Sequence, residues 1–488
     1  MRKAGVLHAI SSLPSRHGIG DFGRAAYQLI DMLADARVRI WQILPINPLG
    51  FGNSPYQPYS SKAIDEIYIS LELLQKDHLL PRQIKTFNRK ATKVDYDAVR
   101  AFKTPLLYKA YQKFIREKRK GLKSFVRKQK WVYHYAVFRA LKAANGMRLW
   151  TEWPEEHKNW IKDKKLDLTP YEDQINFHIF LQYQALKQWK RLRAYAHKRN
   201  IEIMGDIPLY VGIDSDDVWC NQDEFLLDQD GNPTFVAGVP PDYFSVDGQR
   251  WGNPLFNWEV MKENGYQFWI SRLSYNAELF DIIRIDHFRG LDTYWKIPAS
   301  SPTARIGEWI LGPAYDFFDA IFKALPEIHI VVEDLGDLRP EVLQLRDHYY
   351  LRGMNIMQFS FNPNKIKPDQ DHPNMIVYTG THDNETIVGW IENMTPEAFD
   401  ETASYLVLTL NYDEDEPLND KFLRYTMENI AEWAIIPTQD ILGLDGSQRM
   451  NTPGTVGSPN WEWKLASFAA LRERMRFFAT LIVNSHRK

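Results

Sequence analysis

The chain has 488 residues, with 60 basic and 62 acidic side chains and a formal net charge of −2. A charge this close to neutral gives no support to the binding of nucleic acid or anionic lipid. The sequence contains no run of the roughly 18 to 20 apolar residues that crosses a bilayer. The chain has a single cysteine, Cys220, so it cannot form an internal disulfide. We therefore expect a cytoplasmic protein that binds neither nucleic acid nor membrane.

The N-terminal part of the chain alternates strand and helix patterns. Residues 4–10 predict a strand, because this apolar stretch is too short for a secretory signal and contains His8. An amphipathic helix follows, with Ala25, Leu29, Met32 and Leu33 on one face. Residues 39–44 predict a second strand. Residues 48–61, PLGFGNSPYQPYSS, contain too many turn formers for regular structure and predict an aromatic loop.

Residues 71–165 consist of long helical segments rich in lysine and arginine. The basic run YQKFIREKRKGLKSFVRKQK would allow an anion-binding face. The spacing of its apolar residues favours a solvated helical insertion, with Phe114, Leu122 and Phe125 on the buried side.

Strand and helix patterns alternate again from residue 174, and a helix from about residue 465 closes the chain. In all, the sequence predicts eight strands, at residues 4–10, 39–44, 201–206, 281–286, 328–333, 354–359, 375–380 and 433–438. Eight strands alternating with helices predict an α/β protein with a (β/α)8 TIM barrel, whose active site lies at the carboxyl ends of the strands. A doubly wound open sheet is the alternative.

The domain organisation follows from this pattern. We expect residues 1–488 to form a single catalytic (β/α)8 barrel with helical and loop insertions. The insertions are expected to be an active-site loop at 48–70, a mainly helical subdomain at 71–165, and a loop-rich segment at 207–260 that carries a lid over the cleft.

The strand at 281–286 ends in an acidic residue, Asp286. Arg284 lies two positions before it, so both side chains point to the same side of the strand. A neighbouring guanidinium keeps a carboxylate ionised, and an ionised carboxylate can act as a nucleophile. A structural ion pair is the alternative for this strand taken alone.

Other predicted strands end in the same way. A barrel would bring Asp206, Asp286, Glu333 and Asp383 to one rim. Crowded carboxylates raise the pKa of at least one member, which places an acid beside a base, as glycosidic cleavage requires. We expect Asp286 to be the nucleophile and Glu333 the general acid/base. Asp383 would bind sugar hydroxyls and favour the oxocarbenium-like transition state.

A barrel metallohydrolase site is the alternative use of some of these residues, with His8, Asp206, Glu333, His382 and Asp383 as ligands. The paired HxH motif after the first strand is missing, since His8 is followed by Ala9 and Ile10. We therefore expect neither a metal nor another cofactor. The positions of His287 and His382 beside acidic residues favour substrate contact over simple packing.

Eight segments also carry a family resemblance, in order and over essentially the whole chain: SPYQPYSS, GDIPLYV, VAGVPPDYF, GQRWGNPL, RIDHFRG, EDLG, THDNET and RMNTPGT. Together they resemble the amylomaltases, the 4-α-glucanotransferases (disproportionating enzymes) of glycoside hydrolase family 77. The resemblance implies a retaining barrel of the α-amylase clan, with insertions and no C-terminal β-sandwich. By motif, Asp286, Glu333 and Asp383 take the places of the nucleophile, the acid/base and the third carboxylate.

The resemblance further implies a set of donor contacts, from Tyr56, Asp206, Arg284, His287, His382 and Asn451. It also implies that the loop with Pro241, Tyr243 and Phe244 overhangs the cleft, near Gln249 and Trp251. Tyr56 is expected to stack on a sugar ring, with loop packing as the alternative. Two positions depart from the family pattern, Asn53 and Glu385, where relatives often have Asp. Neither touches the predicted chemistry.

The choice between transfer and hydrolysis depends on what accepts the glycosyl group from Asp286. A lid with two prolines and two aromatic residues suits the exclusion of water, and together with the resemblance it favours transfer of α-1,4-glucan segments. The expected partners are glucan donors and acceptors, such as maltooligosaccharides and glucose. A retaining α-glucan hydrolase and a non-catalytic glucan-binding protein are the alternatives, and three intact carboxylates argue against the latter.

Overall fold

The computed structural model describes residues 1–241, 245–363 and 372–487. Eight of its strands form one parallel sheet in the order β10-β11-β12-β1-β2-β3-β6-β9. These are β1 (Lys3–Leu7), β2 (Ile40–Gln42), β3 (Glu202–Ile207), β6 (Ile282–Ile285), β9 (Ile330–Val332), β10 (Gly353–Ile356), β11 (Met375–Tyr378) and β12 (Trp433–Pro437). They correspond one by one to the eight predicted strands. Several are shorter than predicted; β10, for example, ends at Ile356 because the helix α15 begins at Met357.

The two ends of this sheet meet, so it forms a barrel. A parallel bridge joins Val331 of β9 to Arg352, the residue before β10. An open doubly wound sheet would leave these two strands apart at opposite edges. The (β/α)8 prediction is therefore confirmed.

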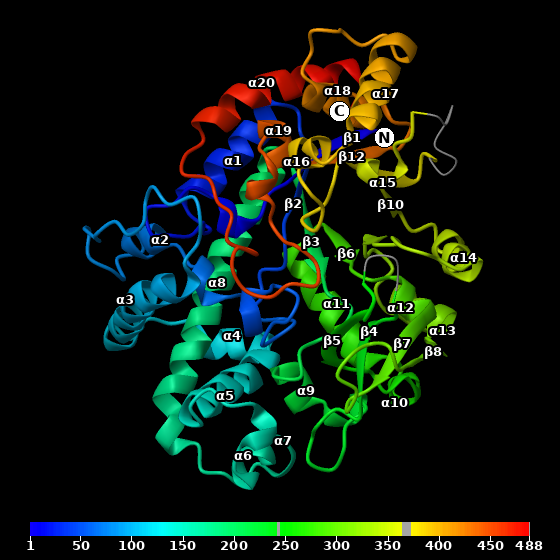
Figure 1. Ribbon diagram of the computed structural model, residues 1–488. Coiled ribbons are helices and arrows are strands. Elements are labelled where there is room, and N and C mark those ends of the chain that lie inside the picture. Colours follow the sequence, from blue (N-terminus) through cyan, green and yellow to red (C-terminus); the bar gives the residue numbers. More distant parts are fainter. Residues whose placement is uncertain (242–244, 364–371, 488) are drawn as a thin grey trace.

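Helices connect the strands and surround the barrel (Figure 1). In chain order the helices that lead back into the next strand or close the chain are α1 (Arg24–Asp35), α8 (Glu172–Lys198), α11 (Gln267–Leu279), α13 (Ala314–Ala324), α14 (Pro340–His348), α18 (Leu418–Glu428) and α20 (Ala469–Asn484). Further helices in these connections are α15 (Met357–Ser360), α16 (Ile387–Glu392), α17 (Pro396–Ser404) and α19 (Thr438–Leu442). In the described part of the chain, no helix has the length and apolar character needed to span a membrane.

A group of helices lies between β2 and α8 and packs on the long helix α8 (Figure 1). Its members are α2 (Leu71–Lys76), α3 (Tyr96–Arg116), α4 (Leu122–Lys128), α5 (Trp131–Ala144), α6 (Glu155–Lys158) and α7 (Trp160–Asp163). The basic run falls on α3 and α4. Its aromatic side chains face α8, where Phe114 packs on Phe180 and Phe125 packs on Tyr183.

A second sheet, which the sequence does not predict, lies beside the barrel. It is antiparallel, with the order β5-β4-β7-β8. The strands β4 (Phe235–Val239) and β5 (Gln249–Pro254) follow β3, and β7 (Thr293–Pro298) and β8 (Glu308–Leu311) follow β6. Short helices flank it, namely α9 (Asp216–Cys220), α10 (Trp258–Glu263) and α12 (Arg289–Asp292). Two separate insertions therefore share one sheet at the rim.

Apolar side chains fill the inside of the barrel, and every strand contributes at least one. They include Leu7, Ile40, Met204, Ile282, Val331, Met354, Ile376 and Ile435. The barrel is thus a packed core rather than a channel. The polar residues at the carboxyl ends of the strands lie next to this packed core.

A side chain reinforces the seam between β9 and β10. Asp334, two residues beyond β9, accepts a hydrogen bond from the Met354 amide at 2.7 Å. Its other carboxylate oxygen is 2.7 Å from Nη1 of Arg346 in α14, and both side chains are buried. The carboxylate of Asp334 thereby replaces backbone pairing where the two strands diverge.

The seam gives the first prediction. We expect Asp334→Ala to lower the free energy of unfolding by about 3 kcal/mol, because it leaves a buried guanidinium without its buried partner. Asp347→Ala removes the other, exposed partner of the same Arg346 and should cost less than about 1 kcal/mol. Urea-induced unfolding measures both, and equal losses would contradict the role given to Asp334.

Candidate active site

The parallel strands deliver six of the predicted site residues to one rim of the barrel. Asp206 lies in β3 and pairs in register with Arg284 of β6. The other four follow the strand ends directly or in the next loop: Asp286 after β6, Glu333 after β9, and His382 and Asp383 after β11. Topology alone brings these residues together from distant parts of the sequence.

Arg284 is the charge centre of the site. Its Nη1 donates to both carboxylate oxygens of Asp206, at 2.7 and 2.8 Å, and to Oδ1 of Asp286 at 2.9 Å. The Arg284 and Asp206 side chains are buried, whereas 28% of the Asp286 side chain is exposed. Burial works to lower the pKa of Arg284, but the two carboxylates outweigh it and raise the pKa, so the guanidinium stays charged.

Asp286 is held on one side only. Among the described residues, its Oδ2 accepts no hydrogen bond, while Oδ1 is fixed by Arg284. A partly exposed carboxylate with one oxygen fixed and one oxygen free is suited to attack an electrophilic carbon.

Glu333 accepts two backbone hydrogen bonds, from the amide of His287 at 2.8 Å and from the amide of Leu335 at 3.0 Å. The His287 backbone has φ = 52°, in the left-handed region that non-glycine residues seldom adopt. Burial and the charge of Asp286 raise the pKa of Glu333 to about 7, against the opposing effect of Arg284 and the two amides. This carboxyl group therefore titrates near neutral pH rather than in the acid range usual for glutamate.

Beside Glu333, an aromatic side chain from β5, Trp251, forms a wall of the site together with Gln249. The Trp251 ring meets the His287 ring edge-on, with centroids 4.9 Å apart. Trp251 also donates from Nε1 to the side-chain oxygen of Gln249 at 3.2 Å. Burial lowers the pKa of His287 to about 4, so its imidazole is neutral. Tyr243 and Phe244, the predicted lid residues, lie outside the described residues.

The loop after β11 forms a second polar group. Asn451 donates to Oδ1 of Asp383 at 2.7 Å, and Nε2 of His382 is 3.4 Å from Oδ2. Burial works to raise the pKa of Asp383, but His382 and the hydrogen bond from Asn451 prevail and lower it to about 2. The charge of Asp383 in turn outweighs burial and raises the pKa of His382.

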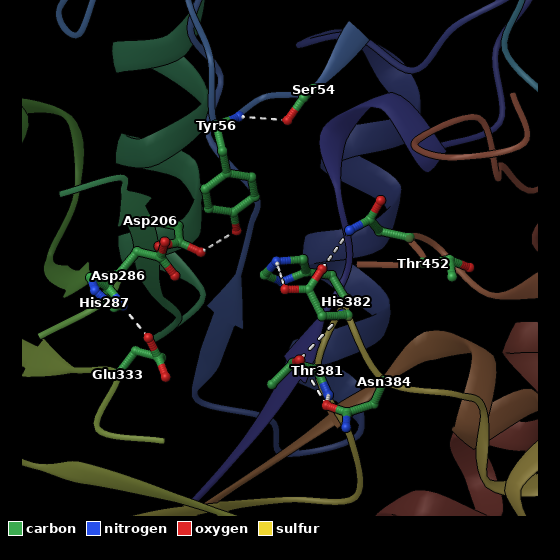
Figure 2. Close-up of polar contacts among 12 residues, drawn as sticks. Ser54, Tyr56, Asp206, Asp286, His287, Glu333, Thr381, His382, Asn384 and Thr452 are labelled. Carbon is green, nitrogen blue, oxygen red and sulfur yellow. Dashed lines mark hydrogen bonds and ion pairs between the residues drawn. The ribbon is translucent and has the colours of Figure 1, made fainter. Parts of the chain in front are cut away.

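Tyr56 joins the two groups. Its hydroxyl donates to Asp206 at 2.7 Å, and its ring stacks on His382, with centroids 5.1 Å apart and 17° between the planes. Figure 2 shows Asp286, His287 and Glu333 on one side of an open space and His382 on the other, with Tyr56 reaching down to Asp206. The sequence-predicted residues thus surround one cleft, apart from the two outside the described residues.

Three further residues support this cleft without having been predicted. The Trp461 ring packs against both Tyr56 and His382, with centroids 5.7 and 5.8 Å away. Arg449 donates to the backbone oxygen of Asp383. Asp440 accepts from the Thr379 hydroxyl at 2.6 Å and from the Ile387 amide at 2.8 Å, and so fixes both ends of the loop that carries Asp383.

The described residues give no support to the alternative of a metallohydrolase site. In residues 1–241, 245–363 and 372–487 there is no group of three or more His, Cys, Asp or Glu side chains that could hold a metal ion. His8 is buried, and its Nδ1 is 2.9 Å from the hydroxyl oxygen of Thr438 rather than from an acidic residue.

Comparison with known proteins agrees with the geometry of the cleft. Residues 8–470 match the profile of glycoside hydrolase family 77, described as 4-alpha-glucanotransferase. This chain belongs to family 77. Its family relatives include the 4-alpha-glucanotransferase of Streptococcus pneumoniae, 41% identical over 474 residues that cover 95% of this chain and 93% of the relative. The enzyme of that name from Thermus thermophilus is 39% identical over 479 residues and 95% of both chains.

A solved family structure has the same fold over the whole chain. It is the amylomaltase from Streptococcus agalactiae in complex with acarbose, which superimposes with a TM-score of 0.94 at 36% sequence identity and with 100% of both chains covered. The barrel with its insertions is therefore the architecture of the family.

Proposed function

We propose that this family 77 protein is a 4-α-glucanotransferase that moves α-1,4-glucan segments between maltooligosaccharides by a retaining double displacement. The observation that carries the proposal is the contrast between two acids of one cleft. Asp286 is held by the Arg284 guanidinium with one oxygen free, and Glu333 has a pKa of about 7. This places a nucleophile held by a guanidinium beside a proton donor. The name of the relatives and the acarbose bound to the Streptococcus agalactiae amylomaltase support a glucan substrate.

In the first half of the reaction, Oδ2 of Asp286 attacks the anomeric carbon of the donor glucan. The glycosidic C–O bond breaks, and the leaving oxygen takes the proton of the Glu333 carboxyl group. The products are a glycosyl ester on Asp286, a free glucan with a new 4-hydroxyl, and a Glu333 carboxylate.

In the second half, the Glu333 carboxylate removes a proton from the 4-hydroxyl of an acceptor glucan. The acceptor oxygen attacks the anomeric carbon, the ester bond breaks, and Asp286 leaves as a carboxylate. Two inversions at the same carbon retain the α configuration. Glu333 ends protonated, ready for the next cycle.

The remaining site residues bind and orient the sugar in this proposal. The ionised Asp383 binds hydroxyl groups of the reacting ring and favours the oxocarbenium-like transition state, with His382 and Asn451 holding it in place. Asp206 and Arg284 orient Asp286. Tyr56 presents its aromatic ring near the reacting sugar.

The insertions shape the cleft around that chemistry. We assign the active-site loop to residues 48–70, which supply Tyr56, and the lid to the segment 207–260, which supplies Gln249 and Trp251. Tyr243 and Phe244 belong to the proposed lid. Residues 71–165 form a helical subdomain in the same single catalytic chain. The lone free cysteine, Cys220, agrees with action in the cytoplasm, where disulfides are rare.

The product profile tests transfer against hydrolysis. Incubation with maltotriose should give glucose and maltooligosaccharides longer than the substrate, because each glycosyl unit passes to another sugar. The total concentration of reducing ends should stay constant. A steady rise in reducing ends would show a hydrolase, and unchanged maltotriose at high protein concentration would show a non-catalytic protein.

Substitution of the two acids tests their separate roles. We expect Glu333→Gln to lower kcat on maltotriose by about 10² to 10⁴, the usual contribution of a general acid, and Asp286→Asn to lower it by at least about 10² as well, because no nucleophile remains. The control variant is Glu327→Gln, which changes an exposed residue just before β9, at the end of the strand away from Glu333. Its kcat should match that of the wild type.

A donor with a good leaving group separates the two variants. Fluoride needs little protonation, so an α-maltosyl fluoride donor should restore formation of the glycosyl ester in Glu333→Gln but not in Asp286→Asn. Burst-phase release of fluoride measures this step. Equal release of fluoride by both variants would contradict the different roles assigned to Glu333 and Asp286.

The pH profile follows from the raised pKa of Glu333. The protonated form that donates to the leaving oxygen persists up to about pH 7 and is lost above it. We expect kcat/KM for the donor to fall about tenfold per pH unit above that value, and this limb to be absent in Glu333→Gln. A profile that stays flat to about pH 9 in the wild type would contradict the assignment.

A further inference from the structure

A separate cavity lies on the outside of the barrel, between the start of α1 and the start of α20. These helices run beside each other in Figure 1. The cavity has a volume of about 470 Å³ and is lined by residues from the segment 14–28, by residues 466–469 and by Arg472. Sites for small ligands commonly measure about 300 to 1,000 Å³.

The charge around this cavity is strongly positive. Four arginines line it, Arg16, Arg24, Arg89 and Arg472. Its two acidic residues already have cationic partners: Glu72 is 4.0 Å from Arg16, and Asp21 is 4.0 Å from Lys103. Among the described residues, Arg24, Arg89 and Arg472 form no ion pair. Three guanidinium groups therefore face the cavity without a counter-charge.

His17 adds a buried polar group to the same cavity. Only 3% of it is exposed, and its ring stacks on Phe102. Within the described part of the chain, neither ring nitrogen has a hydrogen-bond partner. Burial, followed by the charges of Lys103 and Arg16, lowers the pKa of His17 to about 4, so the ring is neutral and carries one N–H donor. Neither ring nitrogen is among the side-chain atoms that are shut off from solvent without a partner, so the ring is open to the cavity and its N–H can donate to a ligand there.

The backbone contributes positive potential as well. The helices α1 and α20 begin at Arg24 and Ala469, both on the cavity wall. Neither N-cap residue, Gly23 or Phe468, provides a capping side chain, and neither first turn contains an acidic residue. The protein supplies one side-chain acceptor at each end: Asp21 accepts from the Gly23 amide at 2.8 Å, and the Ser467 hydroxyl oxygen accepts from the Ala469 amide at 3.4 Å. The other first-turn amides still give both helix ends a partial positive charge.

We propose that this cavity binds a small phosphate ester, with Arg24, Arg89 and Arg472 holding the phosphate and the His17 ring donating to it. A planar guanidinium can donate two parallel hydrogen bonds to two oxygens of a phosphate, which makes arginine well suited to hold this group. Nothing in this assignment depends on the glucan chemistry of the cleft.

The shape of the surface indicates what the rest of the ligand is. A neighbouring cavity of about 390 Å³ continues along α1 and α20 and shares Gln28 and Arg472 with the first. Its walls carry Asp31 and Asp35. Oδ1 of Asp31 accepts from the Tyr195 hydroxyl and Oδ1 of Asp35 from Arg199, which leaves the second oxygen of each carboxylate to accept from hydroxyl groups of a ligand. A polyhydroxylated phosphate monoester fits this combination better than a free phosphate ion.

Isothermal titration calorimetry at low salt tests the proposal with three probes: sorbitol 6-phosphate, inorganic phosphate and sorbitol. An open-chain alditol is used so that the cleft does not take it as a glucosyl donor. Sorbitol 6-phosphate should bind at least tenfold more tightly than inorganic phosphate, and sorbitol should give no heat. Equal affinity for sorbitol 6-phosphate and inorganic phosphate would contradict the proposal of an ester ligand and indicate a site for simple anions.

Paired variants locate the binding. The double substitution Arg24→Gln and Arg89→Gln should weaken sorbitol 6-phosphate at least tenfold, because two of the three unpaired guanidinium groups are lost. The matched control, Arg116→Gln with Arg127→Gln, changes two exposed arginines on α3 and α4 and should bind as the wild type does. Identical affinities in both double variants, or no binding by the wild type, would refute the site. Maltotriose disproportionation should be unchanged in all of them, so this test and the test of the cleft fail independently.

Discussion

The cleft depends on one buried guanidinium. Burying a charge costs several kcal/mol unless it is paired, and Arg284 meets that requirement with two carboxylates. Asp206 is wholly buried and supplies the permanent partner, which leaves Asp286 bound by one oxygen only. Asp206 also accepts from Tyr56, so the same ion pair fixes the loop that leads into the cleft. A single charge therefore orients Asp286 directly and, through Asp206, holds the Tyr56 side chain in place.

The two predicted catalytic acids differ because of what surrounds them. Asp286 lies against a guanidinium, and Glu333 lies against Asp286 and two backbone amides. Amides stabilise the carboxylate form, but burial and a neighbouring negative charge oppose them and win. The unusual backbone of His287 is part of this arrangement, since it directs an amide at Glu333. The strained backbone of His287 therefore helps to position the carboxyl group to which we assign proton donation.

The sequence predicts the eight strands well, because a buried parallel strand is a short apolar run that ends in polar residues. This local signal does not distinguish acidic residues that face the cleft from acidic residues that stabilise the fold. Asp334 and Asp440 follow strands in the same way as Asp286, yet one pins the β9–β10 seam and the other pins the loop after β11. What separates them is exposure to the cleft, which only the fold reveals.

Features made by long-range contacts escape the sequence altogether. The second sheet pairs β4 with β7 across two insertions, and β5 contains glycine and proline, which weaken any strand pattern. Trp461 and Arg449 follow the last strand, where the barrel pattern offers no guide. Tyr243 and Phe244 remain predictions from the family resemblance.

The electrostatics of Glu333 change during the proposed reaction. The charge of Asp286 is one of the two causes that raise the pKa of Glu333, the other being burial. In the proposed glycosyl ester that charge is gone, so the pKa of Glu333 falls. The carboxylate left by the first proton transfer is then stable until it takes the proton of the acceptor hydroxyl. Loss of the ester restores the charge of Asp286 and with it the raised pKa, so one residue can serve as acid and then as base.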